Sequence, residues 1–249
     1  MTVDRNMWAD TFTNDLPHWP CPTCGKGHFA VIKDKLLREE TGPSKSAHTH
    51  DAWEPDWIVN SFTALIQCSM PGCGEVGSVA GTSTLDYDQI GRDEYVTTHY
   101  YKVEHVSSGP IPIALSSSTP KPVVDALKEA SRLIWTSSEA AANQIRQAVE
   151  SIMDDRGMAT HDLAGNRIML HWRIKEFEAT DKDNADVLLA TKWIGNSGSH
   201  VGGITREDVL DAFDMIEYVI EEVYGNTRAK IKAKVAAINA AKGPVKKPY

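Results

Sequence analysis

The stretch Thr191-Lys-Trp-Ile-Gly-Asn-Ser-Gly-Ser-His200 closes an apolar helical pattern with a polar segment that contains two glycines and ends in histidine. Lys192, Asn196 and His200 are spaced four residues apart, so a helix that continues through them places all three side chains along one face. An ammonium, an amide and an imidazole on one face can hold and act on a phosphate-like group. Gly195 weakens a helix, but it also lets backbone or ligand approach closely. These residues are the first candidates for a functional site.

Helical periodicity surrounds this stretch, from Pro120 to the C-terminal part of the chain. The expected helices span about residues 121–135, 137–157, 167–179, 184–193, 205–225 and 227–241. In the second of them, Arg146 and Glu150 are spaced i,i+4, which indicates either a surface ion pair or a pair facing the bundle interior, where the arginine could hold a phosphate. We expect His171, in the third helix, to be packed or exposed rather than a ligand. Short loops between successive helices predict an antiparallel bundle.

The four cysteines form two short pairs, Cys21-Pro-Thr-Cys24-Gly25 and Cys68-Ser-Met-Pro-Gly-Cys73-Gly74. The glycine after each pair lets the backbone turn its amides toward thiolate sulfur. Four thiolates suit tetrahedral Zn2+, so we expect a structural zinc ion held by Cys21, Cys24, Cys68 and Cys73. Two disulfides, four reduced thiols and a redox Cys-x-x-Cys are the alternatives. Disulfides are disfavoured because the chain starts without an apolar signal region.

The sequence around the cysteines alternates as strands do. Strand-like patterns cover residues 57–68, 74–81 and 95–106, and the polar, histidine-bearing residues 36–55 are expected to be an insertion between the cysteine pairs. Proline and serine runs then interrupt regular structure before the helices. We therefore predict an α+β fold, with a zinc-ribbon-like β module at 1–108, a linker at 109–118, a helical bundle at 119–242 and a basic tail at 243–249.

Composition narrows the class of protein. The 249 residues are 41% hydrophobic and 24% charged, which is ordinary for a soluble protein, and no apolar run is long enough to span a bilayer, so we expect a cytoplasmic protein with no membrane contact. A formal net charge of -8 argues against an indiscriminate nucleic-acid coat, but it leaves room for a local basic site. The basic C-terminal segment with Lys230, Lys232 and Lys234 is either a solvated, frayed end or a contact for nucleic acid or an acidic partner.

The order of these features resembles a known family. The two cysteine pairs, the proline-rich passage, the helix with Arg146-Gln-Ala-Val-Glu150 and the segment Ile194-Gly-Asn-Ser-Gly-Ser-His200 together resemble the domain-of-unknown-function 4145 family, which is similar to the HEPN (higher eukaryotes and prokaryotes nucleotide-binding) helical bundles. The resemblance covers about residues 105–225. It implies a HEPN-like bundle and a role in bacterial or phage conflict, such as antiviral defence or restriction.

The resemblance also implies a chemistry. HEPN ribonucleases use an Arg-polar-x-x-x-His arrangement, usually paired across a dimer; here Asn196 and His200 keep their places, but Gly195 stands where the arginine is expected. Lys192 or Arg146 could supply the missing cation, although neither has the bidentate fit of the original position. The reaction would be metal-independent RNA cleavage, in which the histidine assists proton transfer at the ribose 2′-hydroxyl and cations stabilise the pentavalent phosphate.

A non-catalytic interpretation stands beside this one. Asn196 could cap the helix end, His200 could hydrogen-bond across the bundle, and Arg146 with Glu150 could fix helix register. The protein would then be a zinc-containing adaptor, as a homodimer or as a subunit of a larger defence or restriction complex. RNA, another nucleic acid or a protein partner are the expected binding partners.

Overall fold

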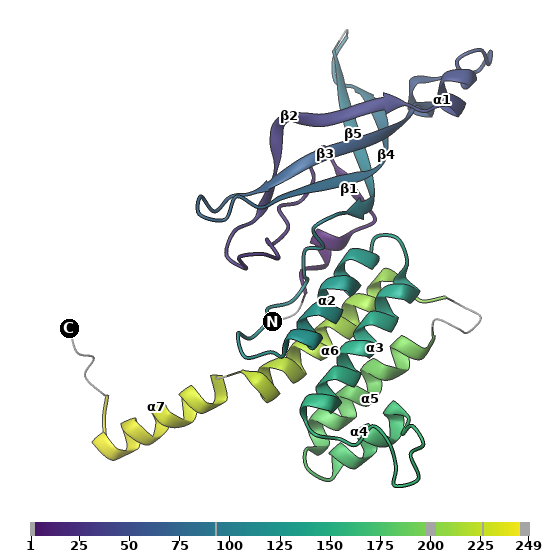
Figure 1. Ribbon diagram of the computed structural model, residues 1–249. Coiled ribbons are helices and arrows are strands. Elements are labelled where there is room, and N and C mark those ends of the chain that lie inside the picture. The colour runs from purple at the N-terminus through teal and green to yellow at the C-terminus, as the bar shows by residue number, and fades with distance from the viewer. Residues whose placement is uncertain (1–2, 93, 198–202, 226, 245–249) are drawn as a thin grey trace.

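The structure is a computed structural model that describes residues 3–92, 94–197, 203–225 and 227–244. It has two halves, an N-terminal sheet and a C-terminal bundle of helices, which lie one above the other in Figure 1. The predicted α+β fold is therefore confirmed.

The N-terminal half is one antiparallel sheet of five strands in the order β1-β5-β4-β3-β2. The strands are β1 (Thr11–Thr13), β2 (Phe29–Glu40), β3 (Val59–Cys68), β4 (Val76–Gln89) and β5 (Tyr95–Val106). Burial alternates along β3, where Phe62, Ala64 and Ile66 are buried and the residues between them are exposed. This period of two is what places Cys68, the last residue of β3, on the buried face.

Two strands were not expected, the short β1 and the longer β2. Residues 36–55 were predicted to be an insertion, but Leu36–Glu40 is the second part of β2, and only the residues after it leave the sheet, through α1 (Gly42–Ala47) and the 3-10 turn η2 (Pro55–Trp57). The pairing of β2 with β3 shifts register between Val31 and Leu36, where Asp34 has a positive φ of 61°. The irregularity hides the alternation, and because β2 is an edge strand its charged side chains can stay in water.

The C-terminal half consists of helices close to the expected positions. They are α2 (Lys121–Leu133), α3 (Ser138–Asp155), α4 (Leu170–Glu178), α5 (Lys182–Ser197), α6 (Arg206–Tyr224) and α7 (Thr227–Ala241). Ser137 caps α3 by accepting a hydrogen bond from the Ala140 amide, and Thr205 forms a capping box with Asp208 at the start of α6. These caps explain why the two boundaries could be read from sequence.

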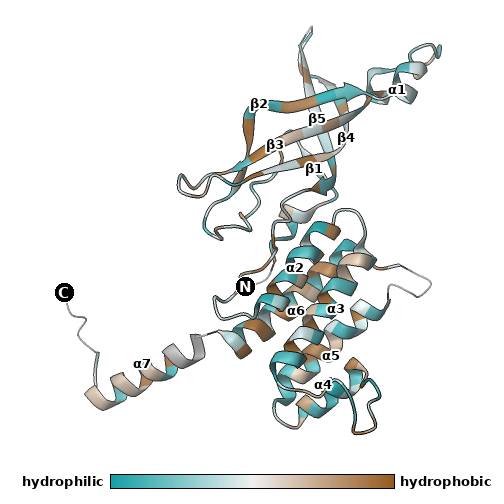
Figure 2. Cartoon of the chain, in the orientation of Figure 1, coloured by the Kyte–Doolittle hydropathy of each residue, from teal (hydrophilic) through white to brown (hydrophobic). Residues whose placement is uncertain are grey.

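Helix α3 lies at the centre of the bundle and packs against α2, α5 and α6. Figure 2 shows hydrophobic and hydrophilic residues alternating around these helices, as expected for helices with one buried face. The largest fully buried side chains of the bundle are Leu127, Ile134, Ile145, Ile152, Met153, Ile174 and Phe213. Their packing fixes the helix positions that shape the cavity described below.

The two halves share one hydrophobic core. Trp19 and Trp135 meet edge to face with ring centroids 5.5 Å apart, and Arg206 of α6 donates to the carbonyl oxygens of Trp8 and Ala9 at 3.2 Å and 2.9 Å. The division at residues 108 and 119 stays a prediction, since the core is continuous across it. Of the predicted tail, residues 245–249 lie outside the described residues.

Helix α7 differs from the others because it extends away from the bundle (Figure 1). Its described side chains, from Ile231 to Ala241, are all exposed. Among the helices that the structure describes, none has the length and apolar character needed to cross a membrane.

Candidate functional site

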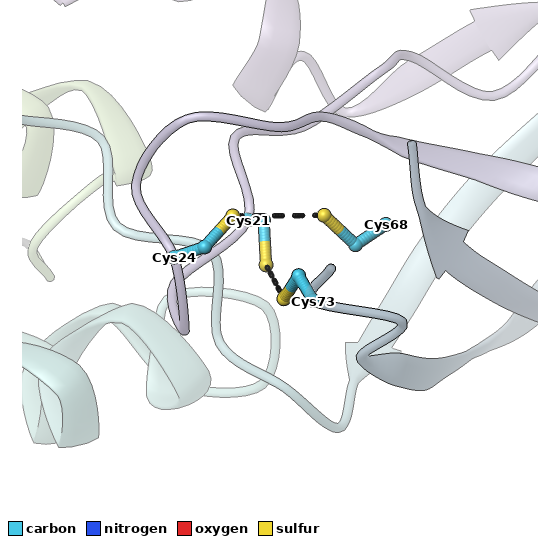
Figure 3. Close-up of side chains that lie close together, drawn as sticks. All are labelled: Cys21, Cys24, Cys68 and Cys73. Atoms are coloured by element: carbon cyan, nitrogen blue, oxygen red, sulfur yellow. Dashed lines mark hydrogen bonds between the residues drawn. The ribbon is translucent and has the colours of Figure 1, made fainter. Parts of the chain in front are cut away.

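The four cysteines converge at one end of the sheet, as their spacing predicts. Cys21 and Cys24 lie in the loop before β2, Cys68 ends β3, and Cys73 lies in the turn before β4. The Sγ atoms of Cys21 and Cys73 are 3.8 Å apart, those of Cys24 and Cys68 are 3.7 Å apart, and all four lie within 4.8 Å of one another. Figure 3 shows the four sulfur atoms directed toward one another. All four are free thiols, and together they could hold a metal ion.

Glycines shape the loops around the cysteines. Gly25 and Gly74 have positive φ values of 61° and 62°, which turn the chain back after each pair. A Cβ at Gly27 would lie 2.5 Å from Cys68 Sγ, so only glycine fits there. The Gly27 amide donates to Cys24 Sγ at 3.4 Å, and the Met70 amide donates to Cys68 Sγ at 3.5 Å. The loops are thus built to surround sulfur with backbone N–H groups.

The same geometry gives the thiols different pKa values. Backbone hydrogen bonds from Lys26 and Gly27 lower the pKa of Cys24 to about 6. At Cys68 the Met70 amide lowers the pKa, but burial and the three neighbouring thiols outweigh it and raise the pKa to about 12. The Cys24 thiolate can therefore form readily, whereas Cys68 and Cys73, whose pKa values are raised, need a compensating positive charge to ionise.

A second candidate site is a cavity in the bundle, beside a tight contact between α3 and α5. A Cβ built on Gly195 of α5 would lie 2.8 Å from Arg146 Cβ and 3.0 Å from the Ala142 carbonyl oxygen. The glycine therefore makes this close approach possible and sets the Arg146 side chain beside the last turn of α5. This helix contact leaves little room for a side chain at Gly195, the position where the family resemblance leads us to expect an arginine.

The cavity has a volume of about 570 Å³ and is bounded by α3, α5, the start of α4 and the loop before it. Its lining residues are Arg146, Glu150, Arg167, Met169, Leu170, His171, Trp172, Lys192 and Asn196. Four of the five residues predicted from sequence, Arg146, Glu150, Lys192 and Asn196, are thus brought together. The fifth, His200, lies outside the described residues.

Charge is unbalanced in this cavity. Glu150 accepts from Arg146 at 2.6 Å and from Arg167 at 3.4 Å, so one carboxylate is shared by two guanidinium groups. Lys192 adds a third cation, which leaves two formal positive charges from three cations and one carboxylate. The Arg146 and Glu150 side chains are 29% and 22% exposed, so the pair faces the cavity in a partly buried setting.

Lys192 is the most buried of the cations, with 7% of its surface exposed. Its Nζ lies 3.5 Å from the centroid of the Trp193 ring, and within the described part of the chain no carboxylate oxygen lies within 4.0 Å of it. Burial and the nearby charge of Arg146 lower the pKa of Lys192. A buried ammonium without an anionic partner is suited to receive an anion.

Five cavity residues were not identified as site residues from sequence: Arg167, Met169, Leu170, His171 and Trp172. The His171 ring lies between two indoles, with its centroid 5.0 Å from that of Trp172 and 6.0 Å from that of Trp193. Its Nδ1 is buried and has no hydrogen-bond partner among the described residues. Helix α4 begins here, and its N-cap Met169 provides no side-chain cap. No sequence spacing links these residues to α3 or α5, so only the fold reveals them.

Comparisons with known proteins returned two family matches. No curated protein and no solved structure matches the chain. Residues 10–104, which include all four cysteines, match the model of a family described as Domain of unknown function (DUF8608). Residues 128–241, which include the whole cavity, match the model of the family described as Domain of unknown function (DUF4145), and this match supports the resemblance to the 4145 family that the sequence suggested.

Proposed function

We propose that the helical half binds RNA at the cavity between α3, α4 and α5, and that it cleaves the bound strand without a metal ion. The supporting observation is the unbalanced charge: Arg146, Arg167 and Lys192 face one carboxylate, Glu150, in a chain whose formal net charge is -8. A local positive cavity in an acidic protein favours a specific anionic ligand over indiscriminate binding.

The donors in the cavity fit a phosphodiester. A guanidinium group can donate two parallel hydrogen bonds to phosphate oxygens, and a buried ammonium contributes a concentrated charge. Asn196, which is exposed on the same side of α5 as Lys192, adds an amide donor. The uncapped start of α4 supplies backbone N–H groups of the kind that bind phosphates.

The proposed reaction needs only groups that this chain supplies. The ribose 2′-oxygen attacks phosphorus, the bond from phosphorus to the 5′-oxygen breaks, and the products are a 2′,3′-cyclic phosphate and a 5′-hydroxyl. The 2′-hydroxyl proton passes to an imidazole, and the leaving 5′-oxygen takes up a proton. The cations stabilise the extra negative charge of the pentavalent phosphate.

We assign the role of the family arginine to Arg146. Its Cβ lies against Gly195, the position where the resemblance places the arginine, and its guanidinium lines the same cavity as Asn196. The cation thus comes from α3 instead of α5. A HEPN-like bundle and a setting in bacterial or phage conflict are part of the proposal, and they rest on the family resemblance.

Cleavage of RNA in EDTA tests this function. Wild-type protein is expected to release products with 2′,3′-cyclic phosphate ends, and Arg146→Met is expected to reduce the rate by about 100-fold, since one donor to a developing oxyanion contributes 10²–10³ in rate. Separate His171→Ala and His200→Ala variants identify the proton acceptor. The matched control is Lys121→Met, at an exposed position on α2. Equal rates for wild type and Arg146→Met refute the proposal.

For the cysteine cluster we propose a structural Zn2+ ion held by Cys21, Cys24, Cys68 and Cys73, in a zinc-ribbon-like role. Zinc–sulfur bonds of about 2.3 Å give a tetrahedron with edges of about 3.8 Å. The separations of 3.7 Å and 3.8 Å between the Sγ atoms fit this size. Metal analysis of purified protein is expected to find about one zinc ion per chain, and less than about half an ion contradicts the proposal.

A second candidate function is that of an adaptor, as a homodimer or within a larger complex. Helix α7 favours it, because Ile231, Val235 and Ile238 are 56%, 50% and 37% exposed and share one face with no covering partner in the described structure. Lys232 and Lys234 lie on the same helix. Replacing both lysines with glutamate is expected to weaken partner binding without affecting RNA cleavage; unchanged partner binding removes the support from α7.

A further inference from the structure

Three large apolar side chains surround the mouth of the cavity and are exposed to solvent. Met169, Trp172 and Trp193 are 65%, 59% and 53% exposed. Met169 and Trp172 line the cavity. Trp193 lies beside it, with its ring centroid 6.0 Å from that of His171, which also lines the cavity. Exposed apolar surface of this size beside a charged cavity indicates a ligand that has both a flat apolar part and an anionic part.

The two indoles differ in what they already contact. One face of Trp193 carries the Lys192 ammonium, whose Nζ lies 3.5 Å from the ring centroid. Trp172 meets the His171 ring at an interplanar angle of 76°, which is an edge-to-face contact. The His171 ring thus packs against both indoles, while Trp172 stays 59% exposed at the rim.

We infer that Trp172 stacks against an unpaired nucleobase at the mouth of the cavity, while the adjacent phosphate contacts Arg146 and Lys192. This inference rests on the proposed function and names its substrate class: single-stranded RNA. In a duplex the bases are stacked inside the helix, so an indole can reach only a base that is unpaired. Base–aromatic stacking accepts every base, so the site selects strandedness more than sequence.

The experiment compares two short strands of 2′-O-methyl RNA, which cannot be cleaved at the 2′-oxygen. One strand carries all its bases, and the other has abasic sugars with the same phosphates. Wild-type protein is expected to bind the complete strand more tightly than the abasic strand by about 5- to 150-fold, the range for one stacked base. Trp172→Leu is expected to lose that difference and to bind the abasic strand as the wild type does.

The controls separate the two proposals. Trp57→Leu makes the same change at a tryptophan that is 43% exposed in the sheet half, and it is expected to leave both affinities unchanged. If the wild type binds both strands equally, and Arg146→Met weakens both, the stacking inference is overturned while phosphate binding stands. If the wild type binds neither strand, the proposed function fails, and this inference fails with it.

Discussion

Replacing Gly195 with alanine adds one methyl group at a tight contact between α3 and α5. The new Cβ would lie 2.8 Å from Arg146 Cβ and 3.0 Å from the Ala142 carbonyl oxygen. Both are atoms close to or within the backbone, so they cannot rotate away as the end of a long side chain can. Relief therefore requires the two helices to move apart.

Two opposing terms set the size of the effect. Alanine in a helix is favoured over glycine by about 1 kcal/mol, whereas overpacking a tight contact costs about 1–3 kcal/mol. We expect a net destabilisation of about 1 kcal/mol, which lowers the Tm by about 2–4 °C in a protein of this length. Arg146 must shift as well, so RNA affinity is expected to fall together with stability.

Thermal unfolding followed by circular dichroism measures this change. Gly243→Ala, after the end of α7, is the control, because a Cβ there meets only the Ala241 carbonyl oxygen within 4 Å, at 3.9 Å. Its Tm is expected to stay the same or to rise slightly. If Gly195→Ala instead raises the Tm, as the preference of helices for alanine over glycine alone would do, the two helices are not in close contact at Gly195. That contact then does not explain why no arginine stands at this position.

Three further predictions concern pH, metal and capping. Burial and the charge of Arg146 lower the pKa of Lys192, so binding of 2′-O-methyl RNA is expected to weaken as the pH rises through a pKa below the ordinary lysine range. Lys192→Met is expected to remove this pH-dependent loss of affinity. The same pH profile in the wild type and the variant would contradict the prediction. Removing metal with a strong chelator is expected to lower the Tm of the wild type but not that of a Cys68→Ser, Cys73→Ser variant, and equal shifts in calorimetry would contradict the four-thiolate site. Thr205→Ala removes the capping box of α6 and is expected to cost about 1 kcal/mol in urea denaturation, whereas Thr49→Ala, in an exposed loop, is expected to cost little; equal effects would show that the cap is dispensable.

The helical half could be predicted from sequence because its signals are local. Ser137 and Thr205 mark helix starts through caps within three residues, and the apolar period of about 3.6 carries the rest. The cysteine cluster was predictable for a similar reason, since each pair with its glycine is a self-contained loop. Strand β2 was missed because the register shift after Val31 interrupts its alternation.

The candidate site was only partly predictable. The i,i+4 spacing places Arg146 with Glu150, and the same spacing places Lys192 with Asn196, but no pattern in the sequence brings α3 and α5 together. Arg167, His171 and Trp172 reach the cavity through the packing of α4, which depends on contacts between distant residues. The contact of Gly195 with α3 could not be predicted either, because nothing in the sequence places Arg146 against it.

The central claim is that the cavity cations bind the phosphates of RNA, and the salt dependence of binding tests it most directly. The affinity for a single-stranded 2′-O-methyl RNA is measured in EDTA over a range of salt concentrations, for wild type and for the Arg146→Met, Lys192→Met double variant. The variant is expected to bind more weakly than the wild type, with a slope of log K against log salt that is smaller by about 0.7 per lost phosphate contact. Equal affinities and equal slopes would contradict it.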